Sequence, residues 1–291
     1  MIKRLMTSVI GLPLLLAVVY AGGWCLQLLL LGLSLIGLSE FYNAMSGNLP
    51  LAPNNADNWR SAAKNAFAGF AGSTNYIGFI FAIVYYILIP NIGSNSYFFI
   101  LITLIITLSL VAMVVFHSKI NIIDCAVTLF GFFYVAFLLS FIYLIRMHSY
   151  GAFFVWLVFI CAFGSDSFAY FAGKAIGKRK MTPNLSPNKT VEGAVAGVAG
   201  AGLLAIVYGA CMGRFLLADE INIVIYCAII GISGAAFSIF GDLAASAVKR
   251  FTGIKDFGKI FPGHGGILDR FDSVIFAAPM VYMVMILLIE R

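Results

Sequence analysis

The sequence predicts an all-α integral membrane protein with about nine transmembrane helices, its N-terminus in the cytoplasm and its C-terminus outside. Of the 291 residues, 62% are hydrophobic and only 10% are charged, whereas soluble domains carry about 25% charged residues. The apolar residues form long charge-free runs, and a helix needs about 20 such residues to cross the hydrocarbon of a bilayer. Most runs are continuous rather than alternating, which is untypical of a β-barrel.

The charge-free runs define the individual helices. Gly22-Gly23 divides the first run, and Pro90-Asn91 divides a later one. The first segment follows the basic sequence MIKR but lacks a clear cleavage pattern, so we interpret it as a retained anchor and not as a signal peptide. The predicted helices cover roughly residues 5–21, 24–43, 74–90, 97–116, 122–145, 151–172, 193–213, 222–240 and 273–289.

The basic residues set the predicted orientation. With nine spans and a cytoplasmic N-terminus, all but three of the 18 Lys and Arg residues fall on the cytoplasmic side, the exceptions being Arg146, Arg214 and Arg291. This asymmetry is what the positive-inside rule expects. The net charge of +6 therefore reflects topology and is poor evidence for nucleic-acid binding. The five cysteines lie in or beside apolar runs without a CxxC pair, which is typical of core residues.

Polar motifs are concentrated in the second half, so the sequence divides into two regions. Residues 1–150 hold five helices and a cytoplasmic loop at 44–73. Residues 151–291 hold four helices and two polar cytoplasmic loops, 173–192 and 241–272. Because the two loops flank the same pair of helices on the same side, we expect them to meet in a shared site.

Two aspartates lie at predicted helix ends near the membrane surface. Asp242 ends the eighth predicted helix, and Asp269 precedes the ninth. A carboxylate at the edge of hydrocarbon is costly unless it is paired or coordinated. One interpretation pairs each aspartate with a neighbouring Lys or Arg. We favour a divalent cation, because Mg²⁺ takes one or two carboxylates together with substrate phosphate oxygens.

Three polar residues extend this pattern beyond Asp242. On a helix that continues from Asp242, the side chains of Ser246, Lys249 and Arg250 share its face at i+4, i+7 and i+8. Basic residues beside a membrane often contact only anionic lipid head groups. Their position next to a carboxylate and a hydroxyl favours a polyanion site, since Arg binds phosphate as a fork and Lys as a point charge.

The segment PGHGG at 262–266 combines turn residues with a histidine. Gly265 and Gly266 allow backbone NH groups to approach a phosphate, although a tight turn back to the membrane is the alternative. His264 has three open roles, as a general base, a phosphate donor or a turn hydrogen bonder. We favour a ligand contact. Zinc binding is disfavoured, because the other two histidines lie in different loops.

The segment SPNKTVEG opens the seventh predicted helix. Thr190 is placed to cap the helix, and Glu192 falls in its first turn. Ser186 and Lys189 face the cytoplasm, and a helix N-terminus beside a lysine is a natural anion site. An ordinary helix start with a positive-inside lysine is the alternative.

Three other carboxylates stand in or beside apolar sequence. Asp166 lies in the sixth predicted helix, where an ionisable residue is a functional candidate by default. A structural partnership of Asp166 with Lys174 or Lys178 is the alternative. Glu40 and Asp124 lie near helix ends, and we assign them only structural pairing.

The sequence SAVKRFTGIKDFGKIFPGHGGILDRFD at 246–272 resembles the signature of the phosphatidate cytidylyltransferases, also called CDP-diacylglycerol synthases. The resemblance extends to GD at 241–242, to DSFAYFAGKAIG and to SPNKTVEG, where Asn188 stands in place of the usual lysine. It covers about residues 155–290. The matching positions of the signature are Ser246, Lys249, Arg250, Lys255, Asp256, Pro262, His264, Gly265, Gly266, Asp269, Arg270 and Asp272.

The resemblance implies an Mg²⁺-dependent reaction at the cytoplasmic face of the bacterial inner membrane. The enzyme would transfer the cytidylyl group of CTP to phosphatidate, giving CDP-diacylglycerol and pyrophosphate for phospholipid biosynthesis. The resemblance also implies a nine-helix homodimer, Asp242 and Asp269 as metal ligands, and K⁺ as a possible second ion. Two alternatives stay open: a CTP-dependent kinase or cytidylyltransferase for another lipid, and a transporter, which charge clustered at one face disfavours.

The chemistry of these substrates predicts a role for each candidate residue. Asp242 and Asp269 hold Mg²⁺, while Lys249 and Arg250 act as catalytic cations that hold phosphates. Lys255 and Asp256 bind nucleotide or brace the loop. The other predicted substrate-binding residues are Ser246, Lys189, Ser186, His264, Gly265, Gly266 and Arg270.

Overall fold

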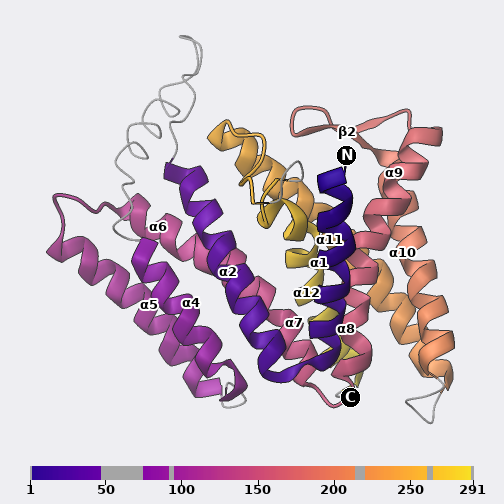
Figure 1. Ribbon diagram of the computed structural model, residues 1–291, viewed down its shortest axis with the longest axis horizontal. Helices are drawn as coiled ribbons and strands as arrows, with labels where there is room; N and C mark the ends of the chain where they lie inside the picture. Colours follow the sequence, from indigo (N-terminus) through magenta and orange to yellow (C-terminus); the bar gives the residue numbers. More distant parts are fainter. Residues whose placement is uncertain (1, 47–74, 92–94, 214–219, 261–264, 290–291) are drawn as a thin grey trace. The chain divides into compact units, whose positions relative to one another are not determined.

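The computed structural model describes residues 2–46, 75–91, 95–213, 220–260 and 265–289. Within these residues the regular structure is helical apart from one two-stranded sheet, so the predicted all-α class is confirmed (Figure 1). The described residues contain seven helices that are long and apolar enough to cross a membrane, and one shorter apolar helix. The chain is therefore a multi-pass membrane protein. The predicted total of nine spans and the orientation of the termini stay predictions.

The helices follow the predicted apolar runs closely. Helices α1 (Ile2–Ala21) and α2 (Gly23–Ser46) are separated at Gly22, whose φ of +65° interrupts the helix. The long helices of residues 122–147 and 151–176 each contain a π-helical turn. The other helical elements are α4 (Asn75–Leu88), the 3₁₀ turn η1 (Ile89–Asn91), α5 (Asn95–Val115), α6 (Ile122–Gly131), the π turn η2 (Phe132–Phe137), α7 (Leu138–Met147), α8 (Gly151–Phe159), the π turn η3 (Ile160–Gly164), α9 (Ser165–Ile176), α10 (Val191–Met212), α11 (Glu220–Thr252) and α12 (Leu268–Ile289).

The structure corrects the predicted ends of two helices. Helix α11 continues past Asp242 to Thr252, and α12 begins at Leu268, so that Asp269 lies in its first turn. The prediction placed both aspartates at or beyond helix ends because the charge-free runs stop there. A helix satisfies its own backbone hydrogen bonds, so it continues where the apolar run has ended.

Helix α11 ends in a glycine cap. Gly253 has φ of +73°, and the Ile254 NH donates to the Lys249 carbonyl oxygen at 3.0 Å. A left-handed residue just past a helix is a common way to satisfy its last carbonyls. The extension of α11 places Asp242, Ser246 and Lys249 on one continuous helix, as the spacing predicts.

A short hairpin precedes α10. Strands β1 (Lys180–Thr182) and β2 (Ser186–Thr190) are antiparallel, with Lys180 opposite Thr190 and Thr182 opposite Ser186. The sequence analysis expected a polar loop here, since the strands are short and lack the apolar alternation that predicts a strand. The hairpin leads directly into the first turn of α10.

Contacts between residues divide the chain into two compact units, which we describe separately. Unit 1 comprises Met1–Thr7, Gln27–Phe137 and Val248–Asp269. Unit 2 comprises Ser8–Leu26, Leu138–Ala247 and Arg270–Arg291. The predicted regions 1–150 and 151–291 rest on where polar motifs occur in the sequence, and that division stays a prediction.

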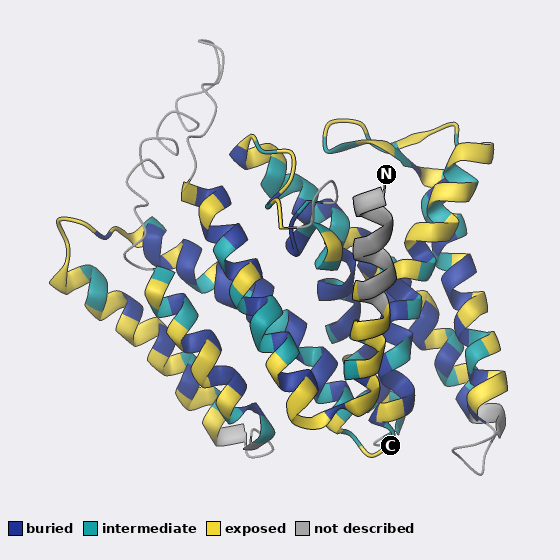
Figure 2. Ribbon diagram, viewed as in Figure 1, coloured by how far each residue is buried: buried dark blue, intermediate teal, exposed yellow. Residues whose placement is uncertain are grey.

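Buried aromatic side chains form the core of unit 1. Tyr42 and Tyr86 are each 1% exposed or less, and their hydroxyls donate to the carbonyl oxygens of Thr128 (2.9 Å) and Ala136 (3.2 Å). These hydrogen bonds satisfy the only polar atom of each side chain, as burial requires. Much of the surface of α5 is exposed (Figure 2), which suits an apolar helix facing lipid.

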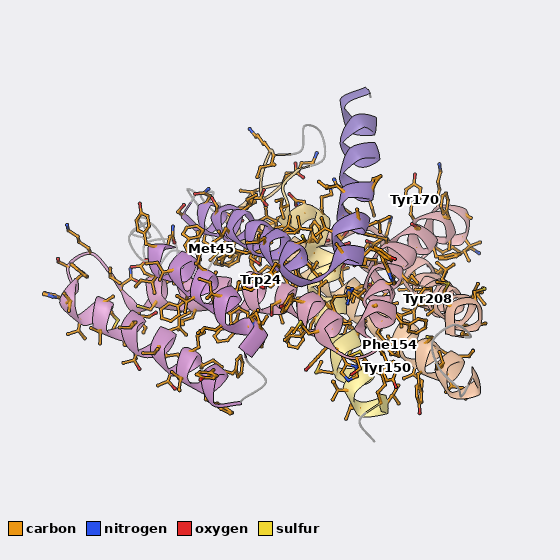
Figure 3. All side chains as sticks on the ribbon, turned by 60° about the horizontal axis from the view of Figure 1, so that its bottom comes forward. Trp24, Met45, Tyr150, Phe154, Tyr170 and Tyr208 are labelled. Carbon is orange, nitrogen blue, oxygen red and sulfur yellow. The ribbon has the colours of Figure 1, made fainter. Side chains whose placement is uncertain are left out.

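Helices α9 and α10 lie side by side in unit 2 (Figure 1). A Cβ atom built on Gly197 of α10 would lie 2.8 Å from the carbonyl oxygen of Ser165, so the backbones approach closely only because this residue is glycine. At the other end of α10, the Tyr208 hydroxyl (Figure 3) donates to the Phe153 carbonyl oxygen at 2.9 Å. These contacts fix α10 against the long helix of residues 151–176, on which Asp166 lies.

We expect Gly197→Ala to lower the midpoint of thermal unfolding. The added methyl meets backbone rather than a movable side chain, and overpacking of this kind costs about 1–3 kcal/mol. Gly32→Ala in α2 is the matched control, because no atom lies within 4 Å of a Cβ built there. Thermal unfolding of detergent-solubilised protein measures both variants. Equal midpoints for Gly197→Ala and the wild type would contradict the described packing of α10.

Candidate active site

Unit 2 contains a cavity of about 300 Å³ between α9, β2, α10 and α11. Small-molecule sites typically enclose about 300–1,000 Å³, so the cavity is at the lower end of that range. Its wall combines two carboxylates and an ammonium with hydroxyl groups and small side chains. The lining residues are Asp166, Ala169, Tyr170 (Figure 3), Ser186, Asn188, Lys189, Thr190, Gly193, Ala194, Ile239 and Asp242.

The charged side chains of the cavity interact directly. Lys189 Nζ lies 2.5 Å from Asp242 Oδ2, and the two side chains are 24% and 27% exposed. The Ser246 hydroxyl lies 3.4 Å from Asp242 Oδ1, and the Ser273 hydroxyl donates to Asp166 Oδ2 at 3.2 Å. The carboxylates of Asp166 and Asp242 repel each other, and Lys189 offsets part of this repulsion. Lys189 is therefore the ion-pair partner of Asp242 and interacts with Asp166 as well.

Local features of α9 place Asp166 at this cavity. The π turn η3 immediately precedes Ser165, and such turns often occur at functional sites because they shift the register of the following residues. Asp166 then projects from the first turn of α9 to the cavity and contacts Ser273. The alternative partnership with Lys174 or Lys178 is not what the structure shows for the Asp166 carboxylate.

The start of α10 is tied to the hairpin by several hydrogen bonds. Thr190 caps the helix, as predicted, by accepting from the Gly193 NH at 3.2 Å. The Val191 NH donates to the Arg179 carbonyl oxygen, and the Glu192 carboxylate accepts from the Arg179 NH. Two NH groups of this helix end therefore already have partners within the chain. Lys189, at the end of the hairpin, lines the cavity.

Asp269 organises a second cluster, which lies in unit 1. Its Oδ1 accepts from Lys249 Nζ at 2.8 Å, and its Oδ2 accepts from the NH groups of Phe257 at 2.8 Å and Gly266 at 2.9 Å. The Lys249 and Asp269 side chains are 16% and 6% exposed. Lys249 Nζ also lies 5.4 Å from the centre of the Phe257 ring, a distance at which a cation and an aromatic face attract. Asp269 therefore closes the loop that follows α11.

The structure describes two residues of the PGHGG segment, Gly265 and Gly266. Gly265 has φ of +84°, a left-handed conformation that favours glycine. The Gly266 NH points to Asp269 and so has a partner within the chain. Residues 261–264, which include His264, lie outside the described residues.

The remaining predicted site residues lie on the surface. Arg250 is exposed near the end of α11, Arg270 is exposed in the first turn of α12, and Lys255 and Asp256 are exposed in the intervening loop. Asp242 and Asp269 belong to different units, so their expected meeting in a shared site stays a prediction. Each aspartate instead pairs with a lysine of its own unit, Asp242 with Lys189 and Asp269 with Lys249.

The sequence analysis missed the role of Glu40. Its carboxylate accepts hydrogen bonds from the Ile267 and Leu268 NH groups at 3.0 and 2.9 Å. The available signal was a single carboxylate in an otherwise apolar run. The sequence contains no indication of its partner, because the two segments are 227 residues apart.

The two proposed metal ligands have suitable chemistry. In the part of the chain that the structure describes, no three His, Cys, Asp or Glu side chains gather into a preformed metal site. Mg²⁺ needs only one or two protein carboxylates when substrate phosphates and water supply the rest. Asp242 is partly exposed on the cavity. Asp269 accepts three hydrogen bonds of the about four that a carboxylate can accept, which leaves one position on Oδ1 for a hard cation.

The fold and the cavity define a multi-pass membrane protein with a polar candidate site in unit 2. The chain belongs to the cytidylyltransferase family, whose sequence profile matches residues 2–288.

Several similar proteins are phosphatidate cytidylyltransferases. The chain is 42% identical over 148 residues to the phosphatidate cytidylyltransferase of Bacillus subtilis (strain 168), across 50% of this chain and 52% of that protein. It is 29% identical over 286 residues to the phosphatidate cytidylyltransferase of Staphylococcus haemolyticus (strain JCSC1435), across 97% and 98%. In the Bacillus comparison the chain spans about half the length of the relative it matches.

Proposed function

We propose that this protein transfers the cytidylyl group of CTP to phosphatidate, forming CDP-diacylglycerol and pyrophosphate. The observation that carries the proposal is the pairing of a lysine with a carboxylate at each signature segment, Lys189 with Asp242 in unit 2 and Lys249 with Asp269 in unit 1. Family membership and the names of the relatives support it. Both substrates, a nucleoside triphosphate and a lipid phosphate, are anions that lysine ammonium groups can bind.

The basic residues bind the phosphate groups of the two substrates. Lys189 lines the cavity of unit 2, while Arg250 and Arg270 are exposed near helix ends. Arg matches phosphate geometry with two parallel hydrogen bonds, and Lys supplies a point charge. Mg²⁺ bound by Asp242 and Asp269 would supply neutralisation of charge on the α-phosphate and on the pyrophosphate leaving group. Ser186 and Ser246 offer hydroxyl donors.

The bond changes require little covalent participation by the protein. A phosphatidate phosphate oxygen attacks the α-phosphorus of CTP in line, and a new P–O bond forms. The bond from the α-phosphorus to the bridging oxygen breaks, and its electron pair leaves with pyrophosphate. Because the nucleophile is already anionic, no general base is needed. Positioning and charge neutralisation account for the catalysis, as is typical of phosphoryl transfer.

The proposal also includes the cellular location and the oligomeric state of the protein. The excess of basic residues in the predicted cytoplasmic segments supports an active site at the cytoplasmic face of the bacterial inner membrane. The homodimer and a second cation, K⁺, rest on the family resemblance alone. Light scattering of the detergent-solubilised protein tests the dimer, and replacement of K⁺ by Na⁺ in the reaction tests the ion.

Reconstitution with labelled nucleotide tests the activity. We expect purified protein in phosphatidate-containing vesicles to move the α-phosphate label of CTP into lipid and to release one pyrophosphate per lipid product. The reaction should require both Mg²⁺ and phosphatidate. Transfer of the γ-phosphate with release of CDP would instead indicate a lipid kinase. Solute flux without nucleotide turnover would indicate a transporter.

A further inference from the structure

Glu40 is a buried carboxylate of α2 that holds the beginning of α12 within unit 1. It is 5% exposed, and Ile267 and Leu268 are 4% and 1% exposed. Glu40 Oε1 accepts from the Ile267 NH at 3.0 Å, and Oε2 accepts from the Leu268 NH at 2.9 Å. These NH groups have no helical partner at a helix N-terminus, and burial would leave them without water. Glu40 therefore satisfies both.

Two glycines leave the space that Glu40 occupies. A Cβ atom built on Gly258 or on Gly266 would overlap the Glu40 carboxylate. Neither glycine has a left-handed φ, so the backbone itself would accept alanine at both positions. Contact with Glu40 is thus the steric reason for glycine at Gly258. The carboxylate lies between the loop after α11 and the first turn of α12.

Glu40 and Asp269 divide three consecutive NH groups between them. The Gly266 NH donates to Asp269 Oδ2, while the next two NH groups donate to Glu40. The orientation of the Asp269 carboxylate therefore depends on a stretch of backbone that Glu40 fixes. The two carboxylates are also close enough for their charges to interact. Asp269 in turn holds Lys249 at 2.8 Å.

We propose that Glu40 is a positioning residue for the reaction. It fixes the backbone from Gly266 to Leu268, and this backbone orients Asp269 and its partner Lys249. The inference rests on the proposed function, in which Asp269 binds Mg²⁺. It assigns a functional role to a helix of the N-terminal half, which the sequence analysis left without one.

Amide hydrogen exchange tests the positioning without reference to activity. We expect Glu40→Ala to accelerate exchange at Phe257 and at Gly266–Leu268, and to leave exchange at the β1–β2 hairpin unchanged. Glu40→Gln retains one acceptor oxygen and should give an intermediate rate. Ser34→Ala is the matched control, since Ser34 is also buried on α2 but bonds Tyr86 at 3.0 Å. It should leave exchange at Gly266–Leu268 unchanged.

The Mg²⁺ dependence of cytidylyl transfer separates positioning from simple loss of stability. Residues that orient metal ligands typically affect metal affinity or activity by about 10–100-fold. We expect Glu40→Ala to raise the half-saturating Mg²⁺ concentration about tenfold, with partial rescue in Glu40→Gln. Ser34→Ala should lower the midpoint of unfolding without changing the Mg²⁺ dependence.

A double substitution tests the specific contact and remains informative if Glu40→Ala folds poorly. Gly258→Ala alone should accelerate exchange and reduce activity, because its methyl displaces the Glu40 carboxylate. In the Glu40→Ala background the same methyl has room, so Gly258→Ala should add no further loss. The inference would be overturned if Gly258→Ala reduced activity by the same factor in the wild-type and Glu40→Ala backgrounds. An unchanged Mg²⁺ dependence in Glu40→Ala and Gly258→Ala would also overturn it. Absence of cytidylyl transfer in the wild type would refute the proposed function, while hydrogen exchange would still test the positioning.

Discussion

Replacing Asp242 or Asp269 with asparagine is expected to reduce CDP-diacylglycerol formation by about a thousandfold or more, equivalent to about 4 kcal/mol of transition-state stabilisation. Asparagine preserves the shape of the side chain but removes the charge that we propose binds Mg²⁺. Each change also leaves a lysine without its carboxylate, Lys189 in one case and Lys249 in the other. Turnover of vesicle-bound phosphatidate at saturating CTP measures the loss.

A loss of folding stability must be distinguished from this loss of catalytic activity. Removing one partner of a buried ion pair is destabilising, and Asp269 is only 6% exposed. Turnover should therefore be compared at a temperature at which every variant is folded. Asp124→Asn is a suitable control, because Asp124 is buried and accepts a hydrogen bond in the N-cap of α6. It should retain activity. Wild-type turnover in Asp242→Asn or Asp269→Asn would remove that residue from the mechanism.

Lys189→Met is expected to reduce kcat/KM by about a hundredfold, equivalent to about 2.7 kcal/mol. The substitution keeps a long side chain but removes the ammonium that faces Asp242. The cavity would then hold the carboxylates of Asp166 and Asp242 without that counter-charge, and it would repel an anionic substrate. Initial rates at varied CTP and phosphatidate concentrations measure the effect and show which substrate depends on Lys189.

Lys180→Met provides the matched control for Lys189→Met. Lys180 is exposed on β1 of the same hairpin, opposite Thr190, and its removal lowers the net charge by the same amount. It should change kcat/KM by less than about twofold, because exposed charges are largely screened by salt. Equal losses in the two variants would mean that the hairpin acts through overall charge and not through the cavity.

The sequence predicts the helices well because each membrane span requires a long apolar run, which can be recognised in the sequence. Long apolar runs correspond to helices in the structure, and Gly22 separates α1 from α2 as expected. The same rule failed at α11, which continues to Thr252 after the charge-free run has ended. Composition marks where a chain leaves the hydrocarbon, whereas backbone hydrogen bonding and caps decide where a helix ends.

The candidate site could be predicted where its signals are local. The spacing of Asp242 and Ser246 predicts a shared helix face, and Thr190 before α10 predicts a cap; the structure shows both contacts. Glu40 could not be assigned in this way, because its partners are distant in sequence and are backbone NH groups. Every residue type except proline has a backbone NH, so the sequence does not indicate which of them bind Glu40.

The central claim is that Asp242 and Asp269 bind the catalytic cation directly, and metal rescue tests it most directly. Asp242→Cys and Asp269→Cys replace a hard oxygen ligand by sulfur, which favours softer ions such as Cd²⁺ over Mg²⁺. We predict that both variants are inactive with Mg²⁺ alone and regain cytidylyl transfer when Cd²⁺ is added. The corresponding serine variants should stay inactive, and wild-type protein, with its own five free cysteines, should not be stimulated. Failure of Cd²⁺ to restore either cysteine variant, in folded protein that still binds CTP, would contradict the account.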